Sequence, residues 1–500
     1  MRIFARALIF LILSATFLYP IPQEIENALK LNRINHFDEA LSLIEQALKE
    51  EKIKPDITSA YTVGRILYRK GELYREMAKV GVLTHIGHLL EIQKREKVLP
   101  DELKVFLGAG YFFNSQFIEG AGILNQVVNK KNADPEFIAL ANVYLGACYI
   151  KTGDKDGARE LWSRVGIKTI YAYSTLGFMY SYLRINPSEG EVITRNALEA
   201  GSEIRAAKRY INPLKVNHAF ALITNGKFAE AYSLISDVNL DEPVYVFKPD
   251  AVTEIRFYDM AILSSYSKVL FGESIKNLEP VVTASSGELA SFASYYISQM
   301  YLYLENYEDS LKFSQKAQKL AVSSSLTMIK SVACETAVYF LEGKEKKGSK
   351  LIEREIERIY GKPSLLLEMM GVFISSNVRY NVIKDIVAKV ESYIYDTEWN
   401  RTRRDSALLG ELSFYTGRYV RALYYLERAR DKGNKNKIET NDPTFLLKLS
   451  YVYYSRDGFA ESLEILFSLG KGFSGIRQIQ DAVQSVYSYR EKGSGEALIE

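Results

Sequence analysis

The sequence predicts an all-α fold, a right-handed superhelical solenoid of about twelve stacked helix hairpins. The first observation behind this prediction is a pattern that recurs at fixed offsets: Leu107 and Gly108 return 38 residues later as Leu145 and Gly146. The second is a small residue on each predicted second helix, and the third is a turn sequence between the two helices of a unit. Self-similarity at a fixed period is typical of repeat architectures.

Each clear first helix has a glycine in its interior. Gly108, Gly146 and Gly410 lie where apolar periodicity predicts helix, although glycine there costs roughly 1 kcal/mol relative to alanine. We interpret these glycines as points where a neighbouring helix approaches closely. Residues 176–180 (Leu-Gly-Phe-Met-Tyr) begin the same signature again.

Small residues also mark the predicted second helices, and large apolar residues follow them at helical spacing. Most are separated by about forty residues, against ~34 in the usual repeat. Three gaps are nearly twice as long, so we expect one degenerate hairpin in each, within residues 55–100, 170–210 and 362–400. The small residues are Ala40, Gly120, Ala158, Ala231, Ser274, Ser310, Gly348, Ala422 and Ser462.

Turn residues separate the two helices of a unit. Gly153-Asp154, Gly226-Lys227 and Gly417-Arg418 each stand between an apolar first helix and an amphipathic second helix. Glycine followed by a polar residue favours a tight turn. The whole set occurs in phase at several places, which indicates repeated hairpins more strongly than composition alone.

This pattern resembles the tetratricopeptide repeat (TPR) family, in the form of a divergent exported array of bacterial type. The resemblance implies that first helices line a concave groove that holds an extended or helical peptide. One subset of the family grips a terminal carboxylate with a Lys/Asn/Arg clamp, and this chain departs from that subset. Positions one, four and five after the first-helix small residue carry rings instead, and the residues of this predicted partner groove are Phe112, Phe113, Phe220, Tyr303, Phe414, Tyr415, Tyr451 and Tyr454.

The predicted groove is thus aromatic rather than cationic. Such a groove favours a hydrophobic peptide or helix, or a glycan laid across tyrosine rings. The chain contains 35 Tyr and 24 Phe, and we expect most of the tyrosines to pack within thin helical layers. The alternative that the groove rings only fill a tight superhelix stays open.

The first twenty residues differ from the rest. Arg2 and Arg6 precede an apolar run over residues 7–18, and Tyr-Pro-Ile-Pro then stops any helix. This pattern predicts a signal peptide or short membrane anchor over residues 1–20. The solenoid is predicted over 21–490 and a polar tail over 491–500. We therefore expect an exported protein of the periplasm or cell surface, with tethering to the inner membrane as the alternative.

Composition and motifs argue against several other functions. The net charge is +3 and the basic clusters are short and mixed with acids, whereas nucleic-acid binding needs a sustained basic face. Cys148 and Cys334 are interpreted as small packing residues. His85 and His88 lie three residues apart, but Glu91 continues around the helix and diverges from His85, so no metal site is predicted.

No phosphate loop, nucleophile elbow or HExxH motif occurs, and such motifs are the signatures of common active sites. We therefore predict a non-catalytic scaffold without cofactors, which binds protein partners of the cell envelope through the aromatic groove. The alternatives are a binding module of a polysaccharide export or synthesis system, and an enzyme or sensor with a site near His85 or Tyr380. The partner and the oligomeric state are not predicted.

Overall fold

The computed structural model describes residues 21–130, 132–236, 238, 257–323, 325–396, 398–430 and 442–472. These residues form 22 α-helices, one short 3-10 helix and no strand, so the predicted all-α class is confirmed. The predicted leader (1–20), the predicted polar tail (491–500) and residues 473–490 of the predicted solenoid lie outside the described residues.

Ten pairs of consecutive helices pack as hairpins, and successive first helices also pack against one another, which makes the arrays TPR-like. The hairpins are α2 (Gln23–Arg33) with α3 (Phe37–Lys49), α5 (Asp101–Phe113) with α6 (Phe117–Val128), α7 (Pro135–Thr152) with α8 (Lys155–Ser163), α9 (Ile170–Tyr182) with α10 (Pro187–Glu203), α11 (Ile211–Thr224) with α12 (Phe228–Ser236), α14 (Gly287–Tyr303) with α15 (Tyr307–Leu320), α16 (Leu326–Leu341) with α17 (Glu345–Arg358), α18 (Pro363–Ser375) with α19 (Tyr380–Asp396), α20 (Arg403–Tyr415) with α21 (Tyr419–Ala429), and α22 (Pro443–Tyr454) with α23 (Phe459–Gly472). The 3-10 helix η1 (Arg205–Tyr210) joins α10 to α11.

The small residues of the repeat lie where the two helices of a hairpin touch. A Cβ added to Gly146 would lie 2.3 Å from Nε1 of Trp162, and one added to Gly108 would lie 2.4 Å from Cγ of Leu124. Each large partner follows its glycine by 16 residues, so the same contact recurs in both units. Close approach through glycine is therefore confirmed as the basis of the repeat signature.

Two hairpins use serine at the same contact. The Ser298 hydroxyl donates a hydrogen bond to the backbone oxygen of Ser310 at 2.8 Å, and the hydroxyls of Ser450 and Ser462 are 2.9 Å apart. All four serines are buried. A buried hydroxyl is costly without a partner, and here the facing serine supplies one.

Two long helices, α4 (Ile57–Glu96) and α13 (Phe257–Ala284), interrupt the series of hairpins. The prediction of a hidden hairpin within residues 55–100 was wrong, because α4 continues as one helix through 40 residues. The hairpins predicted within 170–210 and 362–400 are confirmed as α9–α10 and α18–α19. The predicted hairpin around Ser274 is not formed either, because α13 continues as one helix through the position where the turn before Ser274 was expected.

The two long helices pack against each other and run antiparallel. A Cβ on Gly64 would lie 2.7 Å from Cγ of Leu278, and one on Gly71 would lie 3.2 Å from the Phe271 ring. The Ser267 hydroxyl donates a hydrogen bond to the Gly71 backbone oxygen at 2.5 Å. Glycines thus allow close contact here, as they do within the hairpins.

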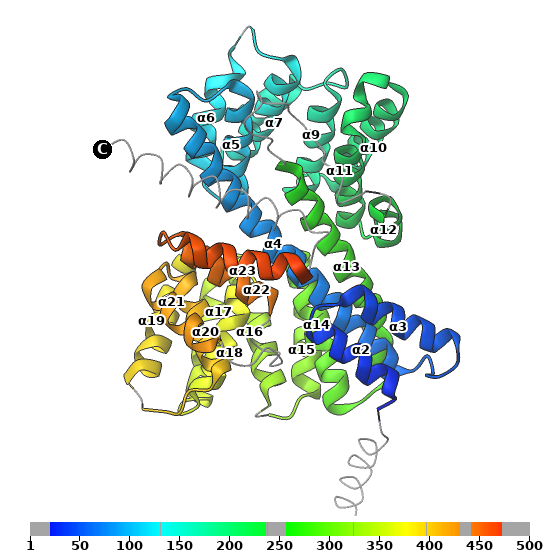
Figure 1. Cartoon of the computed structure of the whole chain (residues 1–500), viewed down its shortest axis with the longest axis vertical. Helices are drawn as coiled ribbons and strands as arrows, with labels where there is room; N and C mark the ends of the chain where they lie inside the picture. Colours follow the sequence, from blue (N-terminus) through cyan, green and yellow to red (C-terminus); the bar gives the residue numbers. More distant parts are fainter. Residues whose placement is uncertain are drawn as a thin grey trace, which may run out of the picture.

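The long helices join two groups of hairpins (Figure 1). We call α5–α12 the N-terminal lobe, and α2, α3 and α14–α23 the C-terminal lobe. The lobes also touch directly, because the Arg184 guanidinium donates a hydrogen bond to the Leu304 backbone oxygen at 2.6 Å. These contacts extend beyond the neighbouring-unit contacts of a simple solenoid.

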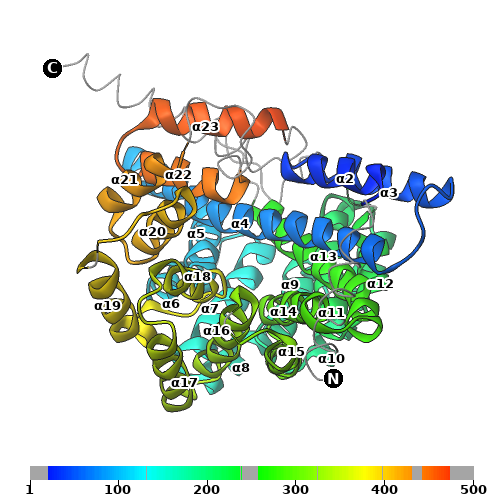
Figure 2. The same cartoon turned by 90° about the horizontal axis from the view of Figure 1, so that it is seen from below.

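The C-terminal lobe folds back on α4, and α22 lies beside that helix (Figure 2). The Tyr68 hydroxyl donates to Oε1 of Gln299 on α14 at 2.8 Å, and Arg69 lies 3.9 Å from Asp442 at the start of α22. The hairpins α14–α15 and α22–α23 therefore both pack on α4.

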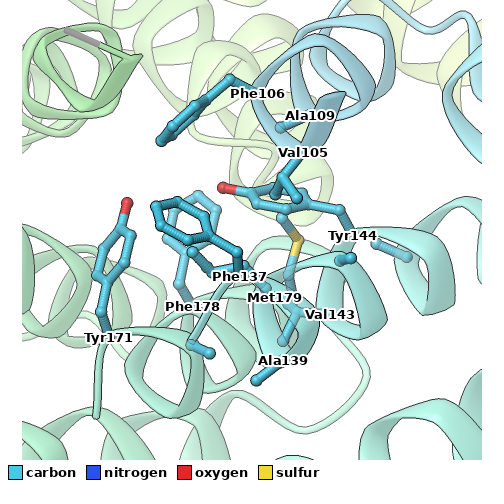
Figure 3. Close-up of a cluster of buried hydrophobic side chains, with 14 of the residues drawn as sticks. Val105, Phe106, Ala109, Phe137, Ala139, Val143, Tyr144, Tyr171, Phe178 and Met179 are labelled. Atoms are coloured by element: carbon cyan, nitrogen blue, oxygen red, sulfur yellow. The ribbon is translucent and has the colours of Figure 1, made fainter. Parts of the chain in front are cut away.

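Aromatic rings fill the core of the N-terminal lobe, and the rings of Phe137 and Phe178 lie between Tyr171 and Tyr144 (Figure 3). The Phe106 and Phe137 ring centroids are 6.1 Å apart in an edge-to-face arrangement, which aromatic pairs prefer. All five residues are at least nine-tenths buried. These five aromatic residues thus serve packing, as predicted for most of the tyrosines.

Both cysteines occupy such packing positions. Cys148 and Cys334 are free and wholly buried. Burial raises the pKa of each thiol to about 12, so both remain protonated and unreactive at neutral pH. The interpretation of the two cysteines as small packing residues is confirmed.

The glycine contacts predict opposite effects for two similar substitutions. Gly146→Ala forces its new methyl group against Trp162 and should lower the free energy of unfolding by about 1–3 kcal/mol. Gly122→Ala in α6 meets no heavy atom within 4 Å and should raise it by up to about 1 kcal/mol, because alanine loses less backbone entropy in a helix. Urea denaturation of both variants checks this, and equal effects would contradict the proposed helix contact.

Candidate functional site

A cavity of about 800 Å³ lies where the two lobes and the two long helices meet, and we call it the central cavity. Several first helices end at its wall. Phe113, Tyr182, Tyr303, Ser375 and Tyr415 are the last residues of α5, α9, α14, α18 and α20 respectively, and all of them line it. The cavity is thus built from helix C-terminal ends of both lobes.

The structure brings six of the eight predicted groove residues together in this wall, with Tyr182, Phe178 and Tyr380 beside them. The six are Phe113, Phe220, Tyr303, Phe414, Tyr415 and Tyr451. Phe112 and Tyr454 are elsewhere. Phe112 is 2% exposed and packs on Phe117 at 5.7 Å between centroids, whereas Tyr454 packs on Phe459 at 5.9 Å. The role of the six in binding a partner remains a prediction.

Helix geometry explains why most of the predicted groove residues line the cavity and why Phe112 and Tyr454 do not. Positions one and five after the small residue are one turn apart and share a face, whereas position four lies about 100° from position five. Phe113 and Tyr303 at position five, and Phe220 and Tyr451 at position one, therefore face the cavity. Phe414 at position four is the exception, and its ring contacts Tyr451 of the next first helix at 5.6 Å.

Cationic side chains share the wall with the rings, so the cavity is both aromatic and cationic. None of these cations was predicted from the sequence to lie here. They are Arg75, Lys79, Lys268, Arg379 and Lys448. The first three lie on α4 and α13, where no first-helix glycine pattern was recognised that would have given their orientation.

Arg75 lies on α4 between the aromatic wall and a helix end. Its guanidinium carbon is 3.8 Å from the centroid of the Tyr303 ring, and its Nη2 donates a hydrogen bond to the Ser375 backbone oxygen at the end of α18. The partial negative charge of a helix C-terminus favours a cation there. Nη2 also lies 3.1 Å from Glu76, but Nε and Nη1 are buried and have no hydrogen-bond partner.

Two ion pairs extend from Arg75 along the wall. Lys79 lies 3.1 Å from Glu76, and Lys448 lies 3.1 Å from Glu411. Burial raises the pKa of Glu76, but Lys79, Lys448 and Arg75 outweigh burial and hold that pKa well below its usual range. Burial, assisted by Arg75, lowers the pKa of Lys79 to about 8. The cluster contains more positive than negative charge at neutral pH.

Lys268 on α13 is a further positive charge in the wall, separate from the cluster of Arg75, Lys79 and Lys448. Its ammonium lies 4.1 Å from the centroid of the Phe220 ring and 5.8 Å from that of Tyr182. Within the described ranges, no carboxylate lies within ion-pair distance of it. Burial lowers the pKa of Lys268. One turn before it, Ser265 is wholly buried and its hydroxyl has no hydrogen-bond partner.

The described part of the chain contains no group of three or more His, Cys, Asp or Glu side chains that could hold a metal ion. The side chains of His88 and Glu91 lie outside the described set, and His85 is partly buried. Tyr380 lines the central cavity, 6.0 Å from Tyr415 between ring centroids. The arrangement offers ring faces and hydrogen-bond donors, which suit binding.

No family model matches the chain, and no curated protein sequence matches it. Solved structures with a similar arrangement of helices include yeast Tom70 (12% identity, 93% of this chain and 96% of that chain, TM-score 0.33). Another is the Cut9–Hcn1 hetero-tetramer of the APC/C (11%, 91% and 88%, 0.28). A third is the TPR domain of P58(IPK) (14%, 79% and 99%, 0.19).

In the ranges that the structure describes, no helix combines the length and the apolar character required to cross a membrane.

Glu72, one turn before Glu76 on α4, leads to a pH-dependent prediction. Burial, and then the charge of Asp442, raise the pKa of Glu72 to about 7 against the opposing charge of Arg75. The unfolded chain ionises this carboxyl near its ordinary pKa of about 4.3. The protonated form therefore stabilises the fold at low pH, and this contribution is lost as the pH rises towards 7.

Glu72→Gln should accordingly raise the melting temperature, by little at pH 5 and by much more at pH 8. Glu45→Gln, at an exposed position on α3, is the control and should change the melting temperature equally little at both values. Thermal denaturation by circular dichroism checks both variants. A constant difference between Glu72→Gln and the wild type from pH 5 to pH 8 would exclude this ionisation.

Proposed function

We propose that the chain is a protein-binding scaffold that holds a segment of a partner protein in the central cavity. The observation that carries the proposal is the convergence of partly exposed rings from both lobes, among them Phe113, Tyr303 and Tyr451, on one open space. A volume of about 800 Å³ lies within the usual range for binding cavities. Partly exposed aromatic rings beside cations are typical anchors for a peptide.

We propose further that the scaffold works in the cell envelope and binds envelope proteins there. This part rests on the basic and apolar character of residues 1–20, which fits a signal peptide or a short anchor. Sequencing the amino terminus of the mature protein, together with cell fractionation, tests it. A cytosolic protein that retains Met1 would exclude the envelope location.

A polysaccharide ligand is the second candidate, because five of the ring-bearing residues in the wall are tyrosines. Tyrosine rings stack on sugars and their hydroxyls form hydrogen bonds. The residues are Tyr182, Tyr303, Tyr380, Tyr415 and Tyr451. Under this candidate, the protein would be retained on an immobilised envelope glycan and would not co-purify with a protein.

The double variant Phe414→Ala/Tyr451→Ala tests the cavity as the binding site. The two rings contact each other across adjacent first helices, and their loss should lower recovery of co-purifying envelope proteins at least about tenfold, as for other aromatic anchors. Tyr424→Ala, at a position on α21 that is 58% exposed and outside the cavity, is the matched control. Pull-down from envelope extracts with quantitative mass spectrometry provides the measurement.

Circular dichroism of the double variant at the pull-down temperature verifies that it is folded. Equal recovery of the same proteins by the wild type, the double variant and Tyr424→Ala would place the binding surface outside the central cavity.

A further inference from the structure

We infer that the central cavity contains a subsite for a carboxylate of an acidic peptide segment, formed by Lys268, Ser265 and Arg75. The inference rests on the proposed function and names the chemistry of the segment that is bound. It starts from hydrogen-bond donors in the cavity wall that have no acceptor within the described chain.

Lys268 supplies the main charge of this subsite. Its partly buried ammonium lies over the Phe220 ring, and this contact is an attraction without charge neutralisation. Glu305 in the same wall acts on Lys268 through its charge but forms no ion pair with it. A buried charge without a counter-charge is costly to a fold. The cost is explained if the counter-charge arrives with the ligand.

Ser265 and Arg75 add donors of the same kind to the same cavity. The Ser265 hydroxyl and the Nε and Nη1 atoms of Arg75 are buried without a hydrogen-bond partner, and both residues line the cavity. In native proteins nearly all buried polar atoms are paired. Three groups in the wall of one cavity, each with unused donors, therefore indicate an acceptor that the described part of the free chain does not contain.

The charge balance of the wall gives the sign of the ligand. Three cations of the α4–α22 cluster (Arg75, Lys79 and Lys448) face two carboxylates, Glu76 and Glu411. This leaves one positive charge in the cluster. In the rest of the wall Lys268 and Arg379 add two positive charges and Glu305 adds one negative charge, so the wall remains positive. An anionic ligand group is attracted to such a wall, and a cationic group is repelled.

The surroundings of Lys268 define the rest of the ligand. Phe220 and Tyr182 lie beside its ammonium and Phe178 adjoins both rings, with centroid distances of 4.6 Å and 5.5 Å. An acidic side chain flanked by apolar side chains matches this pattern. The donors lie on the long helices α4 and α13, away from the repeat positions, so the subsite is a property of the junction between the lobes.

The probe for this inference is a set of fluorescein-labelled nine-residue peptides made in matched pairs. In each pair one peptide has a central Glu and the other a central Gln between the same apolar residues, and both have an amidated C-terminus. A third peptide added to each pair has the central Gln and a free C-terminal carboxylate. Fluorescence anisotropy with the full chain at low salt measures affinity. We expect the Glu member to bind at least about tenfold more tightly than the Gln member.

Lys268→Met keeps the length of the side chain and removes its charge. We expect it to bind the Glu member as weakly as the Gln member, to bind the Gln member as the wild type does, and to melt at the same or a higher temperature. Ser265→Ala should show a smaller loss of the same kind. Lys276→Met, at an exposed position on the same helix, is the control and should bind all peptides as the wild type does.

Equal binding of the Glu and Gln members, or an equal loss of both in Lys268→Met, would overturn the subsite while leaving peptide binding intact. Preference for the free C-terminus alone would also overturn it, because the subsite is assigned to a side-chain carboxylate. A lower melting temperature of Lys268→Met with unchanged binding would show that Lys268 is structural. Failure to bind any peptide, combined with Lys268-dependent binding of a uronic-acid oligosaccharide, would overturn the proposed function itself.

Discussion

The close contact between α4 and α13 is the constraint on which the rest of the structure depends. Gly64 and Gly71 leave room for Leu278 and Phe271, and the Ser267 hydroxyl is bonded to the backbone of Gly71. The two helices together carry both lobes. The central cavity exists because the ends of the first helices in each lobe then face one another across this junction.

The charged residues of the cavity follow from the same geometry. When several helices end at one place, their free carbonyl groups create a region of negative potential. Arg75 bonds to the Ser375 carbonyl at such an end, and Glu76 and Glu411 balance part of the added charge. Neither the helix ends nor these carboxylates contact Lys268, which lies over the Phe220 ring instead.

The hairpins were predictable from sequence because their contacts are local and periodic. In three hairpins the first-helix glycine and its large partner are 16 residues apart, as with Gly108 and Leu124, so the same pattern recurs along the sequence. The lobe junction gives no such signal. Gly71 and Ser267 are 196 residues apart and meet once, so the cations on α4 and α13 could not be oriented, whereas Phe113 and Tyr451 could be recognised from their place in the repeat.

The unbroken form of α4 has a consequence for the spacing of the lobes. At 1.5 Å per residue, a helix of 40 residues is roughly 60 Å long. Its length sets the distance between the hairpin α2–α3 and α5. Removal of a single residue from its middle would rotate everything beyond by about 100°. The length of α4 therefore determines which surfaces of the two lobes face each other.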